Sequence, residues 1–159
     1  MRGALRVQKK PQIFEVYTMK LTARGRYAVT ATAALAARGE GVCASLRELS
    51  EETGISLSFL EQLFGQLRRA GVVESLRGKS GGYRLSQSPR DVSIESVIAA
   101  VDESVRAQGC TPEMKSSCTG VGVKCLTHDL WNALEGHIRD FLRGVTLDDV
   151  VKGRVGEMA

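Results

Sequence analysis

The sequence predicts a mainly α-helical protein with one small β-hairpin, in the order of a winged helix-turn-helix followed by an irregular loop and a long helix. Three observations predict this fold class. Two amphipathic segments flank a tight turn at Gly54, a glycine-rich tip separates two short strand-like runs, and a segment from Asp129 has apolar residues at helical spacing. This order of elements is more specific than any one of them.

The first expected helix is the alanine-rich stretch 22–37, TARGRYAVTATAALAA, which contains no proline. Tyr27, Ala31 and Leu35 fall on one of its faces, and Gly39 stands where a helix would stop. A second, short helix is LRELSEET, residues 46–53. It is preceded by Ser45, with Glu48 three residues on, which is the capping-box pattern of a helix start.

The third expected helix lies in SLSFLEQLFGQLRRAG, residues 56–71. Its apolar residues recur at the spacing of one helix face, and they are Leu60, Leu63, Phe64 and Leu67. The runs VVESL and YRLS then read as two strands around the tip RGKSGG, which has three glycines and two cations. Together these elements predict a helix-turn-helix with a β-hairpin wing over 19–90.

The chain after residue 90 divides into four parts. A connecting helix is expected within 91–105, where Ile94, Val97, Ile98 and Val101 share a face. Residues 106–128 have no periodicity, and such a long irregular loop suggests function. A long amphipathic helix and a short last helix, capped by Thr146 and Asp149, are expected within 129–152, before a tail at 153–159. We interpret residues 1–18 as a disordered extension or the result of a mis-set start codon.

Composition and charge limit the classes of function that the protein could have. The chain has 159 residues, 43% hydrophobic and 25% charged, which is ordinary for a globular protein, and no apolar run is long enough for a membrane span. Residues 20–90 hold eleven basic and six acidic side chains, whereas residues 110–159 hold six and seven. A basic amino-terminal half fits a polyanion such as DNA. No export signal is recognisable, so we expect a reducing cytoplasm, in which structural disulfides are rare.

The third helix and the wing supply the candidate DNA-binding residues: Ser56, Ser58, Glu61, Gln62, Arg77 and Lys79. With the apolar stripe inward, the first four point outward. Gln62 can pair with adenine, Ser58 with phosphate or a base edge, and Glu61 can accept only from cytosine. The cations on the wing tip suit phosphates or the minor groove. The alternative is that all six belong to an ordinary solvated surface.

Three cysteines and one histidine gather in the loop. Cys110, Cys118 and Cys125 are separated by seven and six residues, and His128 follows Cys125 as C-x2-H. A disulfide would leave one thiol over, and a catalytic thiol would need one reactive cysteine with an orienting acid. Metal or cluster binding is therefore the favoured hypothesis. Cys43 lies outside the loop, and we interpret it as a small buried apolar residue.

The spacing leaves the identity of the bound group open. Three thiolates and one imidazole suit tetrahedral zinc, and they suit a 2Fe–2S cluster with two ligands per iron equally well. The sequence contains no phosphate-cradling GxxxxGK and no nucleophile paired with histidine and carboxylate. We therefore expect a protein that is not an enzyme.

From Met19 to about Val151 the sequence resembles the winged-helix regulators typified by the iron–sulfur regulator IscR, a family that includes the nitric-oxide sensor NsrR and the cysteine regulator CymR. The similar stretches are MKLTARGRYAVTA, ISLSFLEQLFGQLRRAGVV, RGKSGGYRLS, AVDESV and KCLTHDLW. The last of these, with two cysteines upstream, is typical of the iron–sulfur regulators of the family, because the nitric-oxide sensor lacks the histidine ligand and the cysteine regulator lacks the cluster.

This resemblance implies a homodimer that binds palindromic promoter DNA and represses, in the main, the genes of iron–sulfur cluster assembly. It implies a 2Fe–2S cluster on Cys110, Cys118, Cys125 and His128, with the cluster-assembly machinery as donor. The helix from Asp129 would be the dimerisation helix. The alternatives are a zinc-binding or nitric-oxide- or redox-sensing repressor, and a redox protein that does not bind DNA.

Overall fold

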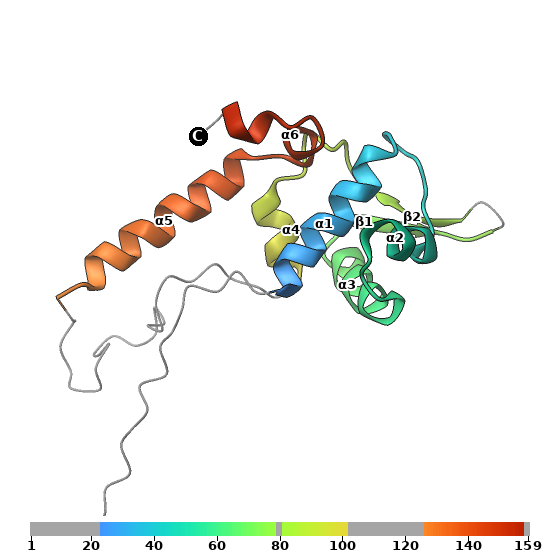
Figure 1. Cartoon of the computed structure of the whole chain (residues 1–159), viewed down its shortest axis with the longest axis horizontal. Coiled ribbons are helices and arrows are strands. Elements are labelled where there is room, and N and C mark those ends of the chain that lie inside the picture. The colour runs from blue at the N-terminus through green and yellow to red at the C-terminus, as the bar shows by residue number, and fades with distance from the viewer. Residues whose placement is uncertain (1–22, 79–80, 102–125, 158–159) are drawn as a thin grey trace, which may run out of the picture.

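The computed structural model describes residues 23–78, 81–101 and 126–157. Within them the chain forms α1 (Ala23–Ala37), α2 (Leu46–Thr53), α3 (Leu57–Arg69), β1 (Val73–Leu76), β2 (Gly82–Leu85), α4 (Ile94–Ala100), α5 (His128–Gly144), α6 (Leu147–Val151) and the 3₁₀ turn η1 (Arg154–Glu157). Figure 1 shows the wing hairpin at one end of the molecule and α5 extending from the other. The predicted class, mainly helical with one hairpin, is confirmed.

Helix α1 lies at the centre of the body and packs against α2, α3, α4 and α6. It can approach all of them closely because its inward side chains are small: Ala28 and Ala31 have no exposed surface, and Leu35 has 1%. The hydroxyl of Thr32, the buried polar side chain of this helix, donates to the carbonyl of Ala28 at 2.8 Å, so it stays paired. The core is aliphatic apart from Phe64.

The helix boundaries agree with the expected ones to within a few residues. The connecting helix is shorter than its apolar pattern suggested, because Val101 leaves the helical conformation and caps α4. The long helix begins one residue early, at His128. Tyr27, which shares a face of α1 with Ala31 and Leu35 by its spacing, is not buried with them. It is 42% exposed and meets Phe59 of α3 edge to face, with ring centroids 5.8 Å apart.

The wing is a two-stranded antiparallel sheet in which Val73 faces Leu85 and Leu76 faces Gly82. Ala44, just before α2, adds a bridge to Tyr83 through hydrogen bonds of 2.8 and 2.9 Å. This pairing requires glycine at position 82, where φ is +148° and a Cβ would lie 2.5 Å from the carbonyl oxygen of Ala44. Strand β2 of the wing is therefore attached to the start of the helix-turn-helix.

Helix α5 differs from the others because none of its residues is buried. It extends from the body at the α4 and α6 side (Figure 1). Leu130, Trp131 and Phe141 are 61%, 39% and 44% exposed, and Leu142 packs against the core. None of the helices that the structure describes is long and apolar enough to cross a membrane.

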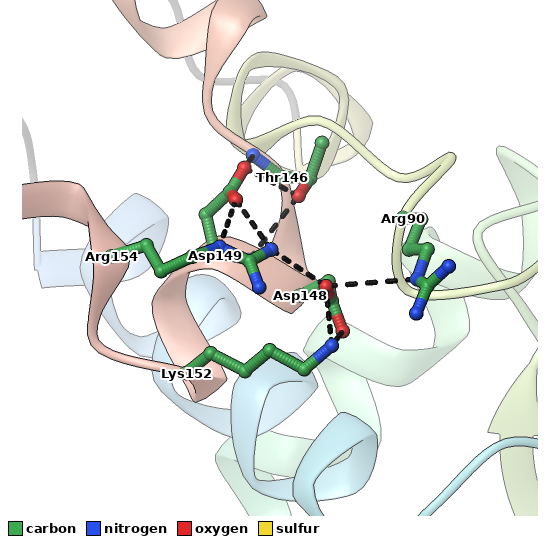
Figure 2. Close-up of polar contacts among 6 residues, drawn as sticks. All are labelled: Arg90, Thr146, Asp148, Asp149, Lys152 and Arg154. Carbon is green, nitrogen blue, oxygen red and sulfur yellow. Dashed lines mark hydrogen bonds and ion pairs between the residues drawn. The ribbon is translucent and has the colours of Figure 1, made fainter. Parts of the chain in front are cut away.

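Two aspartates of α6 organise the carboxyl-terminal segment (Figure 2). Asp148 forms ion pairs with Lys152 at 2.9 Å, Arg154 at 2.7 Å and Arg90 at 3.8 Å. Asp149 caps α6 by accepting from the hydroxyl and the backbone N–H of Thr146, at 2.6 and 3.0 Å. The predicted cap by Thr146 and Asp149 is confirmed as a full capping box.

These contacts make stability sensitive to acid. The bonds from Thr146, followed by Arg154, lower the pKa of Asp149 from 3.8 to about 2, and Lys152 and then Arg154 lower the pKa of Asp148. A carboxyl group with a lowered pKa stabilises the fold above its unfolded-state pKa, and that contribution is lost as the pH falls through the folded-state value.

We therefore expect the stability difference between the wild type and Asp149→Asn to be constant above about pH 5 and to shrink between about pH 4 and pH 2. Urea unfolding followed by circular dichroism across this range measures it. A difference that stays constant down to pH 2 would show that the Asp149 charge contributes nothing.

Candidate nucleic-acid interface

A tight turn sets α3 against α2. Helix α2 ends at Gly54, whose φ of +72° is the left-handed conformation that favours glycine. The hydroxyl of Ser50 then donates to the carbonyl of Ile55 at 2.6 Å, across the turn. At the other end of α2, Ser45 and Glu48 form the predicted capping box. Both ends of α2 are thus held by local hydrogen bonds, and the turn leads directly into α3.

Helix α3 separates cleanly into two faces. Leu60, Leu63, Phe64 and Leu67 have no exposed surface, while Ser56, Ser58, Glu61 and Gln62 are exposed. Ser56 is the residue that precedes the first turn, and its side chain makes no capping hydrogen bond. The predicted outward orientation of these four residues is confirmed. Their short polar side chains lie at the amino-terminal half of an exposed helix, as base readout in a major groove requires.

The orientation of α3 depends on a contact that the sequence did not reveal. Arg24, in the first turn of α1, donates through Nε and Nη2 to the side-chain oxygen of Gln66, at 3.2 and 2.6 Å. Gln66 lies one helical turn after Gln62, so this forked bond restrains the rotation of α3 beside its outward face. The two residues are 42 positions apart. The sequence shows the pattern of polar and apolar residues within each helix. That pattern does not reveal that Arg24 and Gln66 are hydrogen-bond partners.

The wing offers a cation beside its tip. Arg77 directly follows β1 and is exposed, and the next residue, Gly78, has a φ of +116°. Lys79, the second predicted wing cation, lies outside the described residues. On the strands behind the tip, Arg84 donates to Glu74 at 2.6 Å, directly across the two strands. Arg84 is therefore neutralised locally, which leaves Arg77 as the wing arginine suited to a phosphate or a minor groove.

The predicted ligand set is only partly described. Cys110, Cys118 and Cys125 lie outside the described residues, whereas His128 is the half-buried first residue of α5. Its Nε2 lies 2.9 Å from the side-chain nitrogen of Asn132, one turn on. Within residues 23–78, 81–101 and 126–157, no three His, Cys, Asp or Glu residues are grouped as a metal site. Cys43 is a free thiol and is half-buried, less than expected.

A family model described as an iron-dependent transcriptional regulator, Rrf2, matches residues 21–153. The chain belongs to the Rrf2 family. It is 51% identical over 134 residues to the HTH-type transcriptional regulator IscR of Vibrio campbellii, covering 84% of this chain and 78% of the relative. The IscR of Vibrio cholerae is 50% identical over 133 residues, with 84% and 75% covered.

Solved structures agree with this assignment. The cysteine regulator CymR of B. subtilis superposes with a TM-score of 0.71 at 25% identity, covering 85% of this chain and 98% of that one. IscR of T. potens gives 0.66 at 30% identity, with 85% and 88% covered. The fold of this Rrf2 protein is therefore the winged helix predicted from its sequence. The protein is a transcriptional regulator, which is a DNA-binding and not an enzymatic class.

Proposed function

We propose that this Rrf2 protein is a cytoplasmic homodimer that senses iron–sulfur cluster status through a 2Fe–2S cluster and controls, mainly by repression, the genes of cluster assembly. The ligands are Cys110, Cys118, Cys125 and His128, and the cluster-assembly machinery is the donor. The observation that carries the proposal is the place of His128, which begins an exposed 17-residue helix and follows Cys125 at C-x2-H.

The DNA-reading role of α3 follows from the chemistry of its exposed face. The amide of Gln62 can donate to and accept from adenine, and Ser58 can reach a phosphate or a base edge. The carboxylate of Glu61 can accept from the amino group of cytosine and is repelled by phosphates. Ser56 lies at the start of α3, where a helix amino terminus favours an anion. Arg77, and Lys79 beside it, contact phosphates or the minor groove.

The donor set fits the group proposed. Three thiolates and an imidazole complete a 2Fe–2S cluster with two ligands per iron, and replacing a thiolate by an imidazole raises its reduction potential. Lys124 and the amino terminus of α5 both favour the thiolate form of Cys125. The side-chain nitrogen of Asn132 lies 2.9 Å from Nε2 of His128 and restrains the orientation of the ring.

Ligation at His128 would act on α5. With its imidazole held, the first turn of α5 takes one position, and the exposed apolar side chains after it meet a second copy of the helix. Leu130, Trp131 and Phe141 are the exposed members of that face. The tilt between two such helices sets the distance between the two recognition helices. When bound, the cluster supplies the sensitivity to iron and to oxidation.

Two other functions use the same residues. A zinc-binding repressor would hold the same four ligands in a tetrahedral site. A redox protein that does not bind DNA would need the cluster but not Arg77 or the polar face of α3. The exposed cation beside the wing and the family assignment favour the regulator.

Anaerobic purification with iron, sulfide and zinc analysis tests the proposal. The wild type is expected to be red-brown, with about two irons and two acid-labile sulfides per chain. His128→Ala and Cys125→Ala are expected to lose both. His137→Ala is the matched control, because His137 is exposed on the same helix and has no cysteine near it in the sequence, and it should keep the cluster. Stoichiometric zinc in a colourless wild type would contradict the proposal.

A further inference from the structure

The base of α5 is attached to the body by backbone hydrogen bonds. The N–H of Ile94 donates to the carbonyl of Val145 at 2.9 Å, and the N–H of Leu147 donates to the carbonyl of Val92 at 3.0 Å. These two bonds form an antiparallel bridge between Ser93 and Thr146. We call residues 89–95 and 143–148, which contain this bridge, the root clamp.

Side chains reinforce the root clamp on both sides of the bridge. Arg143, in the last turn of α5, donates through Nε and Nη2 to the carboxylate of Glu95, each at 3.3 Å. On the other side, the Asp148 carboxylate pairs with Arg90 at 3.8 Å (Figure 2). Beneath the bridge, Val92, Val145 and Leu147 are at most 4% exposed. Backbone, ionic and apolar contacts thus restrain the same joint.

Residues 89–95 are themselves joined to both DNA-reading elements. They continue from β2, after which the N–H of Ser86 donates to the carbonyl of Val72, next to β1, at 3.0 Å. They lead into α4, which packs against α3 and α1 and in which Val97 and Ile98 are buried. A movement of α5 at its root is therefore transmitted to the wing and to the recognition helix together.

The length of α5 shows why stiffness at this joint matters. Its 17 residues span about 25 Å at 1.5 Å per residue. A rocking of about 10° at one end of such a rod moves the other end by about 4 Å, roughly the 3.4 Å that separates successive base pairs. A loose root would therefore let the dimer bind half-sites whose spacing differs by about one base pair. A stiff root would restrict it to one spacing.

We propose that the root clamp makes α5 and the winged-helix body one rigid unit, and that this rigidity sets the half-site spacing that the dimer accepts. Glu95, Arg143 and Asp148 are then positioning residues for DNA recognition, although none of them lies on the exposed face of α3 or on the wing. The inference rests on the proposed dimeric binding mode and adds to it the element that determines which operators fit.

The test measures spacing tolerance. Wild-type protein is used to select a palindromic site from a random duplex library, and that site is resynthesised with its central spacer changed by one or two base pairs. Because two linked modules gain about 100-fold or more only when both can engage, the wild type should lose up to about 100-fold in affinity on a one-base-pair change. With two glycines inserted between Gly144 and Val145, the loss should fall below about threefold.

The same two glycines inserted after Gly41, an exposed turn residue with a φ of +75°, are the control and should leave the spacing profile unchanged. Should the hinge variant fail to fold, Glu95→Gln with Asp148→Asn loosens the clamp without altering the backbone. Its own control is Glu52→Gln, which removes the 2.9 Å ion pair with Arg38 between α2 and the end of α1. The profile of affinity against spacer length is expected to broaden in the double variant and not in Glu52→Gln.

The outcomes separate the two proposals. A hinge or double variant that stays dimeric by sedimentation and keeps the wild-type spacing profile would overturn the role of the root clamp while leaving the proposed function intact. A wild type that sediments as a monomer, or that selects no palindrome, would overturn the dimeric binding mode itself and the inference with it.

Discussion

Replacing Phe64 with alanine is expected to lower the free energy of unfolding by about 3–5 kcal/mol, as for other fully buried phenylalanines. Phe64 has no exposed surface and meets Tyr83 of the wing edge to face, with ring centroids 5.0 Å apart. Its removal would leave a cavity between α3 and the hairpin and would end an aromatic contact worth about 0.5–1.5 kcal/mol beyond its area. Urea unfolding at several protein concentrations measures the change.

Phe141→Ala is the matched comparison, because that ring is 44% exposed on α5. Its effect should be small at low protein concentration and should grow with concentration if α5 forms the dimer, since association stabilises only the folded state. The Phe64→Ala effect should not depend on concentration in this way. A loss below about 1 kcal/mol for Phe64→Ala would mean that the contact between recognition helix and wing contributes little.

Glu61→Ala is expected to widen the range of DNA sites bound, whereas Gln62→Ala is expected to weaken binding. The Glu61 carboxylate rejects sites that place no cytosine amine opposite it, and a good base contact is worth about 1–3 kcal/mol of discrimination. Removing it should therefore raise affinity for such sites relative to the best site by about 5- to 150-fold. Gln62→Ala should lose about the same factor on sites that carry its adenine and little on others.

Competition gel shifts at one fixed salt concentration compare the two variants, because phosphate contacts make affinity depend on salt. The two side chains are adjacent and both exposed, so each variant serves as the control for the other. An unchanged ranking of sites in Glu61→Ala would remove the carboxylate as a specificity filter. An equal loss on all sites in Gln62→Ala would show that its amide meets phosphate and not a base.

Much of the body was predictable because its signals are local. The capping boxes at Ser45 and Thr146 lie within single turns of helix, and the left-handed residue Gly54 is read from one position. The exposed face of α3 followed from the spacing of four apolar residues, since the helical period alone determines which side chains point away from a core. Element boundaries differed by a few residues at α4 and one at α5, where several caps are energetically similar.

The candidate site was predictable to a smaller extent. The C-x2-H spacing made His128 a candidate ligand, and the glycine-rich tip that follows Arg77 made it a candidate DNA contact; both roles stay predictions. The forked bond between Arg24 and Gln66 was missed because each residue, viewed alone, is an ordinary polar side chain on a helix. The exposure of Tyr27 was not readable for a related reason: its spacing matches Ala31 and Leu35, but only the packed structure shows its ring 42% exposed against Phe59.

The sequence determined the order of helices, turn and wing and which face of each helix is polar. It also placed three thiols and an imidazole close together along the chain. Hydrophobic period, capping and turn chemistry act between residues a few positions apart, so these features can be read without the fold. The attachment of α5 to the body was a property of the tertiary structure alone. It joins residues about 50 positions apart, such as Glu95 and Arg143, through backbone groups that every residue carries. Their pairing is decided only when the whole core of α1, α4 and α6 has packed.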